Sequence, residues 1–227
     1  MPGKVDQKTA PSVQLDPEVQ TKGERTRQRI LDIAYDSIVH KGFAATSIEE
    51  LVEAAGITKS GFFYHFKDKN DLARQALERF ISEDDELIDG LTRRARSLCE
   101  DPLQSFLLFL NLYAEAMDDM PELHPGCLIA TVTYQAALFD KTVLAMNRAS
   151  VLKLRARFAA WLEEIAARHP PRSTADYDAL ADMLTAIVEG SIVLSRALDD
   201  KYLMGRQTRL YREHVKAVFG PDPSARA

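Results

Sequence analysis

The sequence predicts an all-α protein. Apolar residues recur at helical spacing along most of its 227 residues, and no stretch of useful length alternates as a strand would. Two short helical segments near the N-terminus are joined by a glycine-containing turn, which is typical of a helix-turn-helix. We therefore expect about nine helices with short connections and no sheet.

Composition divides the chain into three parts. Residues 1–21 contain three prolines and no apolar periodicity, which predicts a mobile N-terminal tail. Residues 22–70 contain three short helical segments and form the predicted helix-turn-helix domain. Residues 71–227 contain longer amphipathic segments, which predict a larger helical domain with its own core.

The first expected helix starts near Glu24 and ends at Gly42, whose backbone freedom suits a helix C-cap. Its apolar residues recur three and four positions apart, so they share one face. The residues expected on this buried face are Ile30, Ile33, Ala34, Ser37 and Ile38.

The second helix is expected to begin at Thr46. Thr46 and Glu49 have the spacing of a capping box, in which each side chain bonds the other residue's backbone N–H. The helix should end at Ala55-Gly56, and Thr58 is a good N-cap for a third helix. A short helix, a tight turn and a third helix make the predicted DNA-reading unit.

The stretch "ITKSGFFYHFKDK", residues 57–69, places aromatic side chains beside lysines. Phe62 and Phe66 are four residues apart, so they should point the same way and be buried. The opposite face would present hydroxyl and basic groups. Gly61 within a helix costs about 1 kcal/mol relative to alanine, which favours a backbone that lies close to DNA.

Residues 22–78 resemble the DNA-binding domain of TetR-family transcriptional regulators. The resemblance is carried, in order and at fixed spacing, by an arginine-rich start, "GFAATSI", "AGITK", "FYHF" and "KDKNDL". It implies that the chain binds operator DNA as a homodimer and responds to a small-molecule inducer. Beyond residue 80 the chain is similar to the family in architecture alone.

The resemblance also implies specific DNA contacts. It places Thr58, Lys59, Ser60 and Gly61 at the major-groove end of the reading helix. It places Tyr64, His65 and Lys69 against phosphates, with Thr46 bonding a phosphate as well as capping its helix. Phe63 departs from the tyrosine common in the family, so we expect it to contact sugar or a thymine methyl without a hydroxyl bond.

The second domain should begin with a helix after Asp68 or Asn70 and another opened by Asp101-Pro102. Residues 177–199 and 205–219 are expected to form the homodimer interface as a four-helix bundle. The apolar residues assigned to that seam are Leu180, Leu184, Ile187, Val188, Ser191, Ile192, Leu194, Leu210, Val215 and Val218.

An apolar ligand cavity is expected near the break at residues 120–126, among the fifth to seventh helices. Tyr113, Met117, Cys127 and Tyr134 are the predicted lining residues, since they combine polar tips with soft apolar bulk. Gln135 and Asn147 are further candidates for polar anchors.

Several function classes find no support in the sequence. The net charge of −5 argues against nonspecific coating of nucleic acid. The two distant cysteines and the absence of an apolar leader indicate a cytoplasmic protein, and no apolar run is long enough for a membrane span. No nucleophile elbow, zinc-protease, P-loop or dinucleotide motif occurs. We expect no enzyme activity, metal or cofactor.

Two alternatives remain open at this point. Cys127 follows a break and precedes a helix, so it could be a reactive thiol that senses electrophiles or oxidants. A small buried hydrophobe is the commoner role of a free cysteine, and we favour it. The other alternative is an enzyme that uses a helix-turn-helix for protein contacts.

Overall fold

The structure is a computed structural model that describes residues 21–220, and within them every regular element is helical. The predicted tail lies outside these residues except for Thr21. Nine α-helices and one 3₁₀ turn follow one another in this part of the chain, which confirms the all-α prediction. They are α1 (Lys22–Lys41), α2 (Ile48–Ala54), α3 (Lys59–His65), α4 (Lys69–Leu98), α5 (Pro102–Asp118), α6 (Leu128–Tyr134), η1 (Ala136–Leu138), α7 (Lys141–Arg168), α8 (Tyr177–Leu198) and α9 (Leu203–Phe219).

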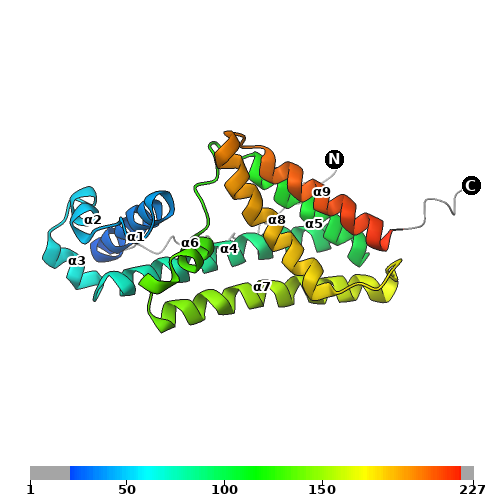
Figure 1. The fold of residues 1–227 in the computed structure, drawn as a ribbon, viewed down its shortest axis with the longest axis horizontal. Helices are drawn as coiled ribbons and strands as arrows, with labels where there is room; N and C mark the ends of the chain where they lie inside the picture. The colour runs from blue at the N-terminus through cyan, green and yellow to red at the C-terminus, as the bar shows by residue number, and fades with distance from the viewer. Residues whose placement is uncertain (1–20, 221–227) are drawn as a thin grey trace, which may run out of the picture.

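Helices α1, α2 and α3 form a small head at one end of an elongated molecule (Figure 1). Phe62 and Phe66 are 0% and 1% exposed, as their spacing predicted. They pack with the buried face of α1 and with Leu72 and Leu77 from the first turns of α4. Because α4 contributes to this core, the head has no separate boundary at residue 70.

The cap of α2 differs from the prediction. Ser47 is the N-cap, and its side chain and that of Glu50 form the reciprocal capping box. Thr46 is buried at 1% exposure, and its hydroxyl donates to the carbonyl of Gly42 at 3.0 Å. The sequence "TSIEE" allows either register, and burial of Thr46 against Ser37 decides between them.

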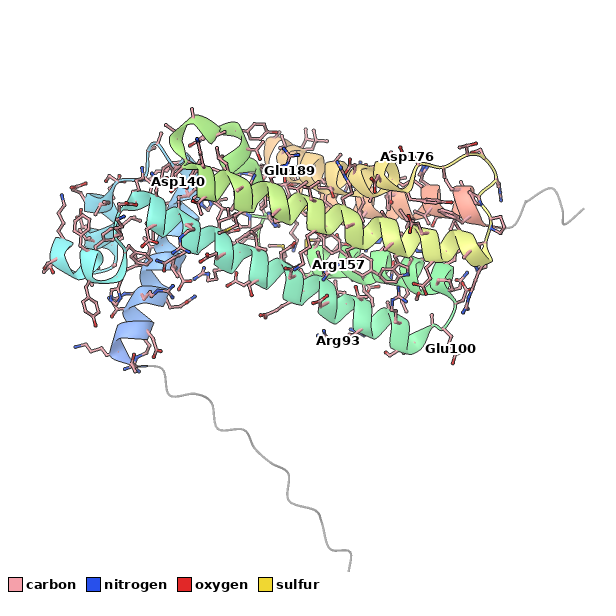
Figure 2. All side chains as sticks on the ribbon, turned by 90° about the horizontal axis from the view of Figure 1, so that it is seen from below. Arg93, Glu100, Asp140, Arg157, Asp176 and Glu189 are labelled. Carbon is pink, nitrogen blue, oxygen red and sulfur yellow. The ribbon has the colours of Figure 1, made fainter. Side chains whose placement is uncertain are left out.

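Helices α4 and α7 run side by side along the body, in the same direction (Figures 1 and 2). Three side-chain pairs connect them, each 68 residues apart: Asp85 with Lys153, Asp89 with Arg157, and Arg96 with Glu164. A constant separation means that both helices advance together at the same rise per residue. Exposed ion pairs of this kind contribute little stability individually. All three can form together only when α4 and α7 are aligned in this one register.

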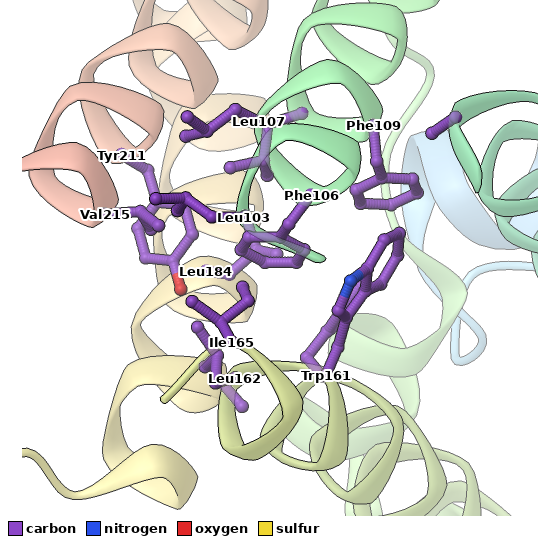
Figure 3. Packing of buried hydrophobic residues seen from close by; sticks show 14 of the residues in the cluster. Leu103, Phe106, Leu107, Phe109, Trp161, Leu162, Ile165, Leu184, Tyr211 and Val215 are labelled. Atoms are coloured by element: carbon purple, nitrogen blue, oxygen red, sulfur yellow. The ribbon is translucent and has the colours of Figure 1, made fainter. Parts of the chain in front are cut away.

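The core of the body lies where α5, α7, α8 and α9 meet (Figure 3). Phe106, Phe109 and Trp161 stack at its centre with ring centroids 5.0 to 6.1 Å apart. Tyr211 of α9 is 1% exposed, and its hydroxyl donates to the carbonyl of Leu180 on α8. The aromatic stripe of α5 is therefore mainly core.

Helices α8 and α9 do present an apolar outer face, which includes two of the ten predicted seam residues, Leu194 and Leu210. Leu184, Ile192 and Val215 are buried in the monomer, and Ile187 packs against the same core. Beside Leu194 and Leu210, the outward apolar residues of the two helices include Met183, Val193 and Leu198, and all five are at least 38% exposed. The outward face of α8 also contains three exposed small residues, which lie three or four positions from its apolar ones. They are Ala186, Gly190 and Ala197.

Candidate nucleic-acid interface and ligand cavity

Helix α3 exposes a polar end and one aromatic side. Its N-cap is Thr58, as predicted, and the Thr58 hydroxyl accepts from the backbone N–H of Gly61 at 3.1 Å. Lys59 and Ser60 are exposed in the first turn, and Phe63 and Tyr64 are 46% and 83% exposed. The buried phenylalanines hold this surface outward, because Phe62 occupies the other side of this seven-residue helix and Phe66 is its C-cap.

The polar groups of this surface have weak partners of their own. Lys59 pairs with Glu49 of α2 at 2.7 Å, but both side chains are well exposed. Ser60 and Thr58 share a hydrogen bond of 2.9 Å between their hydroxyls. Exposed pairs of this type are worth little, so a phosphate or base edge could replace them at small cost.

A basic margin continues from α3 onto α1. A Cβ built on Gly23 would lie 4.0 Å from the ring of His65, so the start of α1 adjoins the end of α3. Lys22 and Arg25 are exposed there, and Lys67 is exposed just after α3. These three were not among the predicted contacts, although the basic run at residues 22–29 was a signal for two of them.

Two predicted phosphate contacts lie elsewhere. Thr46 is buried and its hydroxyl is already bonded within the head. Lys69 donates its ammonium to the carbonyl of Phe43 and lies 4.2 Å from the centroid of the Phe43 ring. Burial lowers the pKa of Lys69. Both residues therefore brace the turn between α1 and α2, and neither presents its polar group to an outside ligand.

Phe43 connects three parts of the chain. It is 4% exposed, and its ring packs on Phe139, which follows η1, at a centroid distance of 4.3 Å. The side-chain oxygen of Gln135, the C-cap of α6, accepts from the backbone N–H of Phe43 at 2.9 Å. Gly42 has a φ of 85°, and a Cβ there would lie 2.4 Å from the Gln135 amide nitrogen. The head and the α6 segment thus fit closely at this point.

The body contains an apolar cavity of about 320 Å³. Its walls come from α4, α5, α6, α7 and α8, so it is enclosed by more helices than the predicted fifth to seventh. Apolar side chains such as Ile88, Phe109 and Phe158 make most of the wall. A cavity of this volume suits a small organic ligand.

Three of the four predicted lining residues line this cavity. Tyr113 and Cys127 lie in its wall, and Tyr134 contributes from α6 although its side chain is 79% exposed. Met117 does not reach it, because it packs on Ile192 and Met204 between α5, α8 and α9.

The two candidate anchors outside that set also lie elsewhere. Gln135 bonds the head. Asn147 is buried outside the cavity wall, and its amide donates at 3.0 Å to the hydroxyl of Thr133, which is a wall residue. Neither amide is therefore positioned to hold a ligand in this cavity.

The chemistry of Cys127 is that of a buried thiol. Burial raises its pKa to about 12, and the neighbouring carboxylate of Glu189 adds to the effect. A reactive cysteine needs the opposite shift, since the thiolate is the nucleophile. This environment favours the role of a half-buried apolar wall residue for Cys127 over that of a reactive thiol.

The sequence did not single out two carboxylates that also line the cavity, Asp84 of α4 and Glu189 of α8. Among the described residues Asp84 makes no hydrogen bond and no ion pair within 4.0 Å. Burial raises the pKa of Asp84 to about 6, with a further increase from Asp85 and an opposing effect of Arg157. No sequence motif marks these positions, because in the sequence each carboxylate has the pattern of an exposed residue on an amphipathic helix.

Within residues 21–220, no three or more His, Cys, Asp or Glu side chains come together as a metal ion would require. None of the helices in that range combines the length and apolarity needed to cross a bilayer.

The raised pKa of Asp84 predicts a stability effect that depends on pH. At neutral pH the carboxylate is ionised in a poorly solvated place, whereas below its ordinary pKa of 3.8 it is protonated in both the folded and unfolded chain. Asp84→Asn should therefore raise the free energy of unfolding by about 1–2 kcal/mol near neutral pH. The gain should fade toward about pH 4.

Urea denaturation at the two pH values measures this difference. Glu86→Gln, an exposed change two residues along the same helix, is the control and should be neutral at both. An equal gain for Asp84→Asn at both pH values would show that its carboxylate is not destabilised by burial.

The helix-turn-helix region is similar in sequence to known bacterial regulators. The model of the family "Bacterial regulatory proteins, tetR family" matches residues 30–76, which cover most of α1, all of α2 and α3, and the start of α4. The HTH-type transcriptional regulator AcrR of Shigella flexneri is 40% identical over 57 residues, which are 25% of this chain and 26% of that protein. The family match is therefore confined to the head and the first turns of α4.

Two comparisons extend through the body. The uncharacterized HTH-type transcriptional regulator YxaF of Bacillus subtilis is 24% identical over 180 residues, covering 78% of this chain and 87% of the relative. The crystal structure of a TetR-family transcriptional regulator from Agrobacterium tumefaciens superposes with a TM-score of 0.71 at 24% identity, over 85% of this chain and 98% of that one. Residues 30–76 therefore match the TetR family of bacterial regulatory proteins, and the body shares the fold of a solved TetR-family regulator.

Proposed function

We propose that the protein is a transcriptional repressor that binds operator DNA through α3 as a homodimer and leaves it when a small molecule fills the body cavity. The observation that carries the proposal is the outward surface of α3, where a capped N-terminus presents Lys59 and Ser60 beside the exposed rings of Phe63 and Tyr64. A reading helix presents its N-terminal residues to base edges in this way. Such a regulator acts on DNA in the cytoplasm.

The contacts divide by chemistry. Lys59 and Ser60 are placed to reach base edges, and Gly61 beside them leaves room for a close approach of the backbone. A methyl group on Gly61 would lie 3.4 Å from the Thr58 hydroxyl, so packing inside the head does not by itself require glycine. Tyr64, His65 and Lys67 face the side where phosphates would lie.

Mutations on α3 should test the DNA contacts. Lys59→Ala and Ser60→Ala should each weaken operator binding by about 1–3 kcal/mol and relax sequence preference, because they remove base readout. Lys67→Ala should weaken all sequences about equally and lower the salt dependence, because it removes a phosphate contact. Selection of bound DNA from a random pool, followed by titration at several salt concentrations, measures both effects.

Arg168→Ala is the matched control for these variants. It removes one exposed positive charge at the end of α7, far from the head (Figure 1). Its operator affinity should equal that of the parent. If Lys59→Ala and Lys67→Ala also match the parent, α3 is not the DNA-reading element.

The homodimer is proposed to form through the outward apolar face of α8 and α9. Small residues at Ala186, Gly190 and Ala197 would let two copies of α8 approach closely, with Leu194 and Leu210 filling the seam. Two-fold pairing would set the spacing of the two α3 helices, which must match successive major grooves on one side of the DNA.

Introducing charge into this seam tests the dimer. Leu194→Glu should yield folded monomers that no longer bind the operator, because an unpaired carboxylate would be buried between subunits. Leu152→Glu replaces a similarly exposed leucine on α7 and should remain dimeric. Light scattering coupled to gel filtration gives the mass, and a dimeric Leu194→Glu protein would place the interface elsewhere.

Ligand binding is proposed to reach the head through α6. Ile129 and Thr133 of α6 line the cavity, and Gln135 at its end bonds the backbone of Phe43. A ligand acts only by favouring one of two conformations. A shift of α6 on filling the cavity would pull on the turn that precedes α2, and so would change the orientation of α3.

Gln135→Ala should uncouple the two sites. With an inducer found by screening metabolites, the variant should keep its ligand affinity and its operator affinity without ligand, but release DNA less. The expected loss is about 1–3 kcal/mol of coupling. Fluorescence anisotropy of labelled operator during ligand titration measures the release. Full release by Gln135→Ala would mean that the signal travels through α4 alone.

A further inference from the structure

The cavity wall has an unusual charge balance for an apolar site. Its one lysine, Lys153, donates to Asp85 at 2.6 Å and is largely exposed, so this pair is neutral. His124 also lines the cavity, and burial together with nearby Arg196 lowers its pKa, so it is neutral near pH 7. Asp84 and Glu189 are then left as negative groups without a cation of their own in the wall.

Neither carboxylate has a directly bonded cation among the described residues, although Arg157 lies near enough to Asp84 to oppose part of the rise in its pKa. No hydrogen bond or ion pair within 4.0 Å links Asp84 to any side chain of residues 21–220. Glu189, seen on α8 in Figure 2, has no cationic partner within 4.0 Å in that range either, and it interacts with the Cys127 thiol. An uncompensated carboxylate beside apolar walls is costly, so these groups are placed where a ligand could compensate them.

Tyr113 lies close to both carboxylates, which shows that they share one region of the cavity. It lines the same space, and the charges of both Asp84 and Glu189 act on its hydroxyl. That hydroxyl has no hydrogen-bond partner among the described residues. A hydroxyl and two carboxylates facing an aromatic wall that includes Phe109 and Phe158 form a suitable set for a positive group carried on an apolar body.

We infer that the inducer is a lipophilic organic cation, whose positive group faces Asp84 and Glu189 while its apolar body lies among Ile88, Phe109 and Phe158. This inference rests on the proposed function for the effect on DNA, but the charge preference is a property of the cavity itself. An anionic ligand would face two uncompensated carboxylates, and the only lysine in the wall is already paired. A neutral ligand would leave both carboxylates uncompensated.

Three probes with one aromatic body and different charges test the inference. They are naphthylmethylamine, naphthylmethanol and naphthoate, measured by calorimetric titration of the full chain near neutral pH. The amine should bind at least about tenfold more tightly than the alcohol, and the carboxylate more weakly than both, because the partly buried charges interact at a reduced effective dielectric.

Isosteric variants show which groups cause the preference. Asp84→Asn and Glu189→Gln should each reduce the advantage of the amine over the alcohol to about threefold or less, with little change in affinity for the alcohol. Glu86→Gln, exposed on the same helix as Asp84 and outside the cavity wall, should keep the full preference. Circular dichroism melts confirm that each variant is folded.

The outcomes that overturn the inference are specific. They are equal binding of amine and alcohol to the parent, tightest binding of naphthoate, no saturable binding of the amine at millimolar concentration, or a preference that survives in the Asp84→Asn/Glu189→Gln double variant. Operator binding without any probe is measured separately. Failure there would remove the proposed function and leave the charge preference standing.

Discussion

The structure depends on one helix that belongs to two cores. The first turns of α4 bury Leu72 and Leu77 among the head helices, and its later turns bury Ile88 and Ala95 in the body. A continuous helix of 30 residues transmits rotation and translation with little loss, because its backbone hydrogen bonds resist bending. Helix α4 therefore gives the body a direct mechanical connection to the core that holds α3.

A second connection limits that motion. Phe43 is bonded or packed by Gln135, Phe139 and Lys69, which come from the end of α6, the residue after η1 and the first residue of α4. The head is therefore held at two points, and a signal from the cavity can act through either. The close fit of Gly42 against Gln135 leaves this contact little room for sliding.

The two carboxylates in the cavity wall lower the stability of the fold. An apolar wall with neutral side chains would be more stable than one with Asp84 and Glu189 lacking partners. Protonation of Asp84 below about pH 6 would relieve part of this cost, in the sense given by its raised pKa. A bound cation would do the same at neutral pH, so ligand binding and folding stability would be linked through these side chains.

The sequence by itself determined the helical fold, the burial of Phe62 and Phe66, and the exposed surface of α3, because helical periodicity and local caps are encoded within a few residues. Only the tertiary structure decided which apolar face of α8 and α9 is buried in the monomer, that Lys69 and Thr46 bond the turn between α1 and α2, and that Asp84 and Glu189 share one cavity. Those outcomes depend on which helices pack together across long separations in the chain. A one-dimensional pattern gives the faces of a helix but not the neighbour that each face meets.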